Sequence, residues 1–183
     1  SSYKALKISR NNPAKPSVIS GPTNGVCNAT GQVYSVANVN GMVYNWTNSN
    51  SNAVVATGQG TSNITADFNP GYTTGSFSVT AANACGTSLT RTLSVKALPA
   101  VPGSIIGPST VCAHQTGVPY STTPVFGAVN YTWVAPAGSK ISDGVVTSTG
   151  ATLITTSNAV TINFGGNSGN VKVRANNPCG SST

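Results

Sequence analysis

The feature that most constrains this chain is an internal repeat that covers almost its whole length. The landmarks Gly-Pro-x-x-Val-Cys (with one extra residue in the first copy), Tyr-Ser, Tyr-x-Trp, strand-Phe and Cys-Gly occur twice in the same order. Their positions are Cys27 and Cys112, Tyr34 and Tyr120, Trp46 and Trp133, Phe68 and Phe164, and Cys85 and Cys179. A period of about 86 residues suits a whole domain rather than a solenoid unit. The sequence therefore predicts two tandem domains.

Short alternating segments predict the structure of each copy. Apolar residues alternate with polar ones over residues 63–68 and 77–81 in the first copy and over 160–164 and 171–175 in the second. Such period-two segments, separated by Gly, Asn and Pro, are typical of half-buried antiparallel strands. Six or seven strands around a central Trp predict an all-β fold: two tandem immunoglobulin-like antiparallel β-sandwich domains.

The ends of the chain are out of phase with the repeat. We expect the first sandwich over residues 13–98 and the second over 99–183, and we interpret residues 1–12 as the final strand of a preceding repeat plus a linker. Tyr3, Leu6 and Ile8 mark that inter-repeat strand, because Leu6 and Ile8 match Leu93 and Val95 in the last strand of the first copy. The second copy then lacks its last strand. Either the chain is a window of a longer array, or copies join head to tail into fibres.

The composition argues against catalysis and against a metal or cofactor site. The chain has two carboxylates, Asp67 and Asp143, no Glu, and one histidine, His114. General acid–base chemistry and most glycoside hydrolysis use paired groups, and calcium and zinc sites need several ligands. The two aspartates fall in different copies. We therefore expect no enzyme activity, no cofactor and no metal.

The charge and hydropathy exclude two classes of partner. The net charge is +7, but the cations form no dense run and do not interleave with aromatic residues, which disfavours nucleic-acid binding. A chain with two carboxylates is basic by default. No apolar run is long enough to insert into a membrane.

The four cysteines fall at matched positions, two in each copy. We interpret them as the disulfides Cys27–Cys85 and Cys112–Cys179, the one connectivity of three that keeps each bridge inside one copy. Free buried thiols are the alternative. Paired cysteines in a β protein with few charges favour an oxidising, extracellular location.

The aromatic residues have a structural and a functional interpretation. Trp46 and Trp133 occupy the strand whose tryptophan fills the core of an immunoglobulin-like sandwich. We assign them to the core, together with Tyr34 and Tyr120, whose hydroxyls can hydrogen-bond near a sheet edge. A carbohydrate-binding face would need exposed aromatics instead, and the candidates are Tyr3, Tyr72 and Phe126.

The ordered landmarks resemble the PKD-like repeats of large secreted Bacteroidetes surface proteins. The second copy, with Tyr131-Thr-Trp-Val-Ala-Pro136-Ala-Gly138, is the closer match, whereas the first departs from it after Trp46. The Trp-Asp-Phe-Gly-Asp-Gly motif of other PKD domains is absent. The resemblance implies secretion, often by the type IX route, and a place among adhesins, gliding-associated proteins or accessory regions of polymer-degrading enzymes.

These observations predict a non-catalytic structural or adhesive segment that acts as a spacer or fibre-forming array at the cell surface. Proline-marked joints at residues 13–16 and 99–102 fit this, because proline stiffens linkers. Neighbouring repeats or head-to-tail copies are the expected partners, and surface polysaccharide is a further candidate. The alternative function is a carbohydrate-binding accessory module of a polysaccharide-degrading enzyme.

Overall fold

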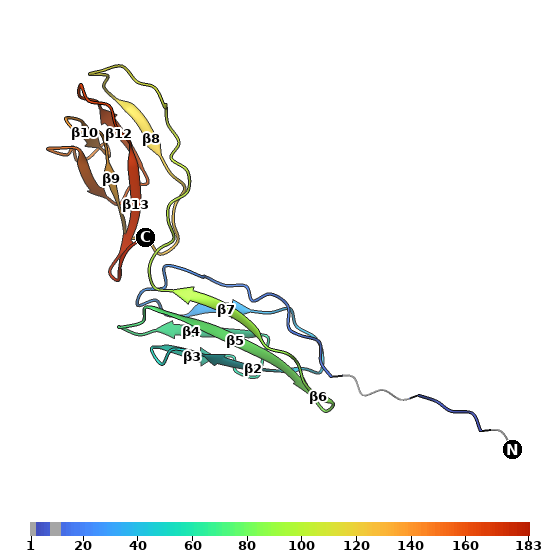
Figure 1. Ribbon diagram of the computed structural model, residues 1–183. Helices are drawn as coiled ribbons and strands as arrows, with labels where there is room; N and C mark the ends of the chain where they lie inside the picture. Colours follow the sequence, from blue (N-terminus) through green and yellow to red (C-terminus); the bar gives the residue numbers. More distant parts are fainter. Residues whose placement is uncertain (1–2, 8–11) are drawn as a thin grey trace. The chain divides into compact units, whose positions relative to one another are not determined.

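The chain forms two compact units, each built from strands. The structure, a computed structural model, describes residues 3–7 and 12–183. The first unit takes in the chain up to Thr23 and Asn28–Val95, and the second takes in Asn24–Cys27 and Lys96–Thr183. The described residues form β-strands and no helix (Figure 1), and so none that is long and apolar enough to cross a membrane.

The first unit contains two antiparallel sheets. Its strands are β1 (Gln32–Ser35), β2 (Val43–Asn48), β3 (Ala53–Thr57), β4 (Asn63–Phe68), β5 (Thr74–Asn83), β6 (Gly86–Thr87) and β7 (Arg91–Lys96). One sheet has the order β1-β4-β3, and the other has β2-β5-β6 with β7 also pairing β5. The register places Trp46 opposite Val79, so alternate residues of both strands face the same core.

The second unit repeats this plan with one strand more between its tryptophan strand and the strand that ends near Phe164. Its strands are β8 (Val118–Ser121), β9 (Asn130–Val134), β10 (Lys140–Ser142), β11 (Thr152–Thr155), β12 (Ala159–Asn163), β13 (Lys172–Asn177) and β14 (Gly180–Ser181). The sheets have the orders β10-β12-β8 and β11-β9-β13-β14. The expected all-β fold of two tandem sandwich domains is confirmed.

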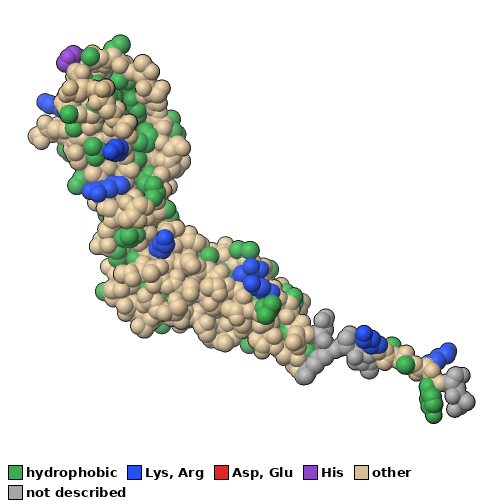
Figure 2. All heavy atoms as spheres, viewed as in Figure 1, with side chains coloured by type: hydrophobic (Ala, Val, Ile, Leu, Met, Phe, Trp, Pro, Cys, Tyr) green, Lys and Arg blue, Asp and Glu red, His purple; other side chains and the backbone are tan. Residues whose placement is uncertain are grey.

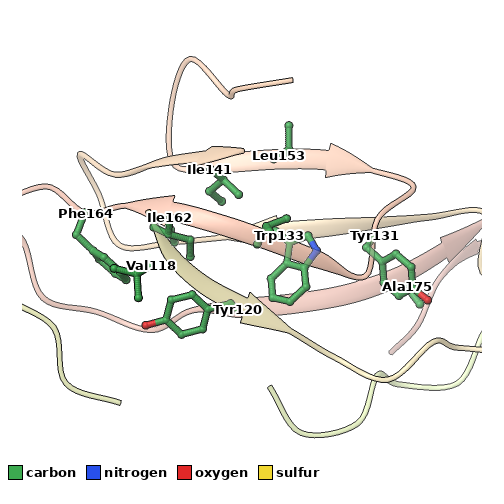
Figure 3. Close-up of a cluster of buried hydrophobic side chains, with 11 residues drawn as sticks. Val118, Tyr120, Tyr131, Trp133, Ile141, Leu153, Ile162, Phe164 and Ala175 are labelled. Atoms are coloured by element: carbon green, nitrogen blue, oxygen red, sulfur yellow. The ribbon is translucent and has the colours of Figure 1, made fainter. Parts of the chain in front are cut away.

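Alternation along the strands builds the two cores. In the first unit, Tyr34, Phe68 and Phe77 are buried, and the ring centroids of Tyr34 and Phe77 lie 4.7 Å apart. In the second unit, Trp133 belongs to a buried cluster with side chains from β8, β9, β10, β11, β12 and β13, and Figure 3 shows this cluster. Burial of such apolar surface is the main favourable contribution to folding.

Matched tyrosines close the same end of each core. The Tyr34 hydroxyl donates to the Pro22 carbonyl oxygen at 2.9 Å, and the Tyr120 hydroxyl donates to that of Pro108 at 2.8 Å. Both rings are buried. This agrees with the predicted role of these tyrosines, in which a ring packs inside while its hydroxyl finds a backbone partner.

The proposed inter-repeat strand is described only in part. Tyr3 and Leu6 are exposed and belong to no strand, and Ile8 lies outside the described residues. In the first unit β5 also pairs the final strand β7. The strand that matches β5 in the second unit is β13, and within the described residues it pairs β9 and β14. The assignment of the first residues to a preceding repeat stays a prediction.

Candidate functional site

Asp67 serves as a hydrogen-bond acceptor for a turn. Its Oδ1 accepts from the Gly31 backbone N–H at 2.7 Å. At the matching place in the second unit, the Oδ1 of Asn163 accepts from the Gly117 backbone N–H, also at 2.7 Å. Because a neutral amide makes the same bond, the role of Asp67 does not require an ionised carboxylate.

Asp143 organises the loop that joins β10 to β11. Thr155 Oγ1 donates to its Oδ2 at 2.6 Å, and the backbone N–H groups of Val145 and Val146 donate to its Oδ1 at 2.9 and 2.7 Å. The Thr155 hydroxyl first, and then these backbone groups, lower the pKa of Asp143 to about 2. A carboxylate held this way is a poor proton acceptor at neutral pH.

His114 occupies a turn rather than a cluster of polar groups. Its φ is 62°, and its backbone N–H donates to the Gly165 carbonyl oxygen at 3.2 Å. Asn28, 86 residues earlier, has φ 51°. Asn and His are enriched in this left-handed conformation, so the turn itself explains both residue types. Within residues 3–7 and 12–183, no three His, Cys, Asp or Glu side chains gather at one place.

The tryptophans lie in the cores, which confirms the interpretation made from the repeat. Trp46 and Trp133 are 2% and 0% exposed. Their indole N–H groups donate to the carbonyl oxygens of Thr61 at 2.9 Å and of Ser157 at 3.4 Å. Neither ring is available to stack on a sugar.

The candidate carbohydrate-binding aromatics differ in exposure. Tyr72 is 3% exposed, packs against Phe68 with ring centroids 4.8 Å apart, and donates to the Val95 carbonyl oxygen at 2.9 Å. Burial raises the pKa of Tyr72 to about 12. Its selection as an exposed candidate was wrong. Tyr3 and Phe126 are exposed, and they belong to different units.

The surface offers hollows, but the described residues bring no acid–base pair together in them. One hollow of about 550 Å³ in the second unit has Tyr120 and Asp143 in its lining. Both are already engaged, the tyrosine hydroxyl with Pro108 and the carboxylate with its own loop. On the face in Figure 2, Lys and Arg side chains lie as separate spots.

The disulfide of the structure differs from both predicted pairs. Cys27 bonds to Cys179, with their Cα atoms 5.8 Å apart and 152 residues of sequence separation, and Cys85 and Cys112 are free. The predicted bridges Cys27–Cys85 and Cys112–Cys179 were therefore wrong. The error lay in assuming that each bridge stays within one sequence copy.

The physical reason is the position of the Asn24–Cys27 segment. It lies within the first copy in sequence but belongs to the second unit, where the Gly25 N–H donates to the Leu98 carbonyl oxygen at 2.8 Å. Gly25 also packs directly against Gly127, leaving no room for a side chain. The one signal in the sequence is an additional residue in Asn24-Gly25, where the second copy has Thr110 alone.

Comparison with known proteins finds a family match and, among solved structures, distant likenesses. The family model for a PKD-like domain matches residues 12–95 and 98–183. A crystal structure of the FN1–FN3 domains of chicken CNTN1 is similar, with 13% identity, a TM-score of 0.32, and coverage of 92% of this chain and 64% of that one. A crystal structure of domains A168–A170 from titin is similar with 15% identity and a TM-score of 0.36, and the match covers 92% of this chain and 63% of that one.

The chain thus spans less than two-thirds of the length of these two solved chains. No curated protein sequence matches it. The fold rests on the strand pairing of each unit and on the family match, which covers nearly the whole chain.

Proposed function

The chain belongs to the PKD-like domain family, and from that premise we propose that it is a non-catalytic spacer segment of an extracellular surface protein. One observation carries the proposal: the polar and aromatic landmarks shared by the two copies are used in building the fold. The tryptophans and tyrosines fill cores, and Asp67 and Asn163 hold the same turn. A segment whose shared aromatic and polar landmarks serve its own fold is suited to carrying other modules.

The disulfide supports an extracellular location. Cys27 and Cys179 are bonded, and such bonds persist in oxidising compartments outside the cytosol. Export by a type IX route and an adhesive role in the parent protein are the finer parts of this proposal, and they follow from the resemblance to secreted surface repeats.

Surface location has a direct test. Antibodies raised against the folded chain should label intact cells of the source organism, and a protease added outside the cells should remove that signal. Labelling that requires permeabilised cells would contradict the proposal.

A binding assay separates the spacer from the carbohydrate-binding alternative. The exposed ring of Phe126, at 60%, is the aromatic of the second unit that could contact a sugar. The chain should remain in solution when mixed with insoluble cellulose, chitin or cell-wall glycans. Depletion from solution that Phe126→Ala abolishes would favour the binding module and overturn the spacer.

A further inference from the structure

We propose that the disulfides of this protein are staggered between PKD-like repeats: Cys112 bonds to the Cys-Gly cysteine of the repeat that follows, and Cys85 bonds to the Val-Cys cysteine of the repeat that precedes. The inference rests on the proposed function, which it deepens by naming the partner and the bonding atoms. A second copy of this chain carries both complementary cysteines and serves as the probe.

The observed bond is the template for this pattern. Cys27 is the Val-Cys cysteine of the first sequence copy, and Cys179 is the Cys-Gly cysteine of the second. Cys112 and Cys85 are the remaining members of the same two classes, and both are free. Each therefore lacks the partner that its counterpart in the other copy has.

The turn that receives the Val-Cys segment is present in both units. In the second unit the Ala128 N–H donates to the Val125 carbonyl oxygen at 3.2 Å, and Gly127 within this turn packs against Gly25. In the first unit the Met42 N–H donates to the Val39 carbonyl oxygen at 3.3 Å, which forms the matching turn around Gly41.

The matching glycine in the first unit has open space in front of it. Gly41 has φ +79°, and a Cβ built there meets no atom of residues 3–7 and 12–183 within 4 Å. A Cβ on Gly127 would collide with the backbone of Gly25. The first unit thus presents the same turn, with the surface that Gly25 occupies in the second unit left uncovered.

The two Cys-Gly turns have the same local structure. The Asn177 Oδ1 accepts from the Cys179 backbone N–H at 3.0 Å, and the Asn83 Oδ1 accepts from that of Cys85 at 2.8 Å. Cys85 is therefore held in the same kind of turn as the one that presents Cys179 to Cys27.

The linker that precedes each repeat passes beside this turn in both units. A Cβ on Gly180 would lie 3.1 Å from Leu98, and a Cβ on Gly86 would lie 2.6 Å from Asn12, which stands 86 residues before Leu98. In the second unit the Val-Cys segment pairs with this linker, through Gly25 and Leu98. The first unit carries the equivalent linker next to Cys85.

The Val-Cys segment of the second copy is uncovered where the first is covered. Val26 is fully buried and Cys27 is half-buried within the second unit. Val111 is only partly buried, and Cys112 is exposed beside a hollow of about 310 Å³. An apolar residue and a thiol that are buried in one copy and accessible in the other are consistent with a docking segment that lacks its partner.

The bond forms by ordinary thiol–disulfide exchange with a disulfide oxidant such as oxidised glutathione. The Cys112 thiolate attacks the glutathione disulfide, which releases one glutathione thiolate and leaves a mixed disulfide. The Cys85 thiolate of the second copy then attacks the Cys112 sulfur of that mixed disulfide and releases the other glutathione. Two protein thiols lose two protons and two electrons, and the oxidant becomes two glutathione thiols.

The test uses two variants of the full chain, each with one free cysteine. Cys85→Ser retains Cys112, and Cys112→Ser retains Cys85. After equilibration of the mixture in a glutathione redox buffer, we expect the Cys112–Cys85 heterodimer to exceed either homodimer by about tenfold or more. Random pairing alone gives about twofold, so the expected preference is about 1 kcal/mol. Non-reducing electrophoresis and peptide mapping measure the ratio.

A second substitution tests the docking surface. The substitution is Gly41→Asn in the Cys112→Ser chain. Asparagine tolerates the left-handed backbone, but its side chain would fill the space in which the docking segment has to pack, as Gly25 packs against Gly127 in the second unit. The heterodimer excess should disappear. The matched control is Gly31→Asn in the same chain, because Gly31 has φ +64° and also faces open space. The control should keep the excess.

The outcomes separate this inference from the proposed function. A random mixture of dimers, or mapping that finds Cys85 bonded to Cys27 in the monomer, overturns the staggered pattern and leaves the spacer proposal standing. Binding to an insoluble glycan overturns the spacer proposal and leaves the disulfide pattern untouched.

Discussion

The two units support their tryptophan strands by different means. In the second unit, β11 pairs β9, with Leu153 opposite Trp133. In the first unit, an isolated bridge joins Tyr44 to Gly60, and the Gln59 side chain hydrogen-bonds to the backbone of Trp46. Its Oε1 accepts from the Trp46 N–H at 3.0 Å, and its Nε2 donates to the Trp46 carbonyl oxygen at 2.9 Å.

This contrast between the units shows which parts of the fold are interchangeable. A side-chain amide carries the same donor and acceptor as a peptide group, so Gln59 can satisfy a strand edge that a neighbouring strand satisfies in the other unit. The core positions do not vary in this way, because a buried ring has to fill a fixed volume. The residues that the two copies share are therefore those that fill the cores, whereas the groups that hydrogen-bond to the edge of a strand can differ between the copies.

The largest expected effect comes from removing one core tryptophan at a time. Trp46→Ala should lower the free energy of unfolding of the first unit by about 3–5 kcal/mol, and Trp133→Ala should do the same to the second unit. Each variant keeps one tryptophan, so fluorescence during urea unfolding follows the intact unit and hydrogen exchange follows the damaged one. Val33→Ala, at a 56% exposed position, is the control. Equal losses in both units would contradict the picture of two separate cores.

The next effect concerns the disulfide. Cys27→Ser or Cys179→Ser should lower the free energy of unfolding by about 2–4 kcal/mol, because the cross-link restricts the unfolded chain. The loss should appear in the second unit, which contains both residues. Cys85→Ser should have no comparable effect on the isolated chain, and calorimetry would measure all three variants. If Cys85→Ser lowered the free energy of unfolding of the first unit, that result would favour the bridge Cys27–Cys85 within one copy.

Gln59 provides a smaller and sharper test of the comparison. Gln59→Ala leaves the Trp46 backbone N–H and carbonyl oxygen without these partners and should cost about 1–3 kcal/mol in the first unit. Ile154→Ala, on the strand that replaces Gln59 in the second unit, changes an exposed side chain and should cost less than about 0.5 kcal/mol. Urea unfolding of both variants checks the contrast. Equal costs would show that the amide does not act as a strand edge.

The smallest effect is a pH dependence confined to the second unit. The pKa of Asp143 is lowered to about 2, so its ionised form is stabilised by folding. The contribution is present above the unfolded pKa of about 3.9 and is lost as the pH falls through about 2. Melting temperatures measured across this window should fall less for Asp143→Asn than for the unchanged chain. An identical acid response would show that the loop hydrogen bonds do not matter.

The sequence contained enough information for the cores but not for the cross-link. Period-two alternation and the Tyr-x-Trp landmark locate residues such as Trp46 because burial on one sheet face leaves a local pattern. Tyr72 was misplaced because it has no counterpart in the second copy and sits outside the strands. Cys27 was mispaired because the unit to which Asn24–Cys27 belongs is decided by packing between residues far apart in sequence.

The Cys27–Cys179 bond also determines how the molecule would respond to being pulled. Residues 28–178, which make up most of both units, lie inside the loop that this bond closes. A tensile force applied to the ends passes through the two sulfur atoms and does not reach the enclosed backbone. The 152-residue separation hides roughly 500 Å of contour at about 3.3–3.6 Å per residue. The stretch between Cys27 and Cys179 therefore cannot extend under such a force until this one bond is reduced.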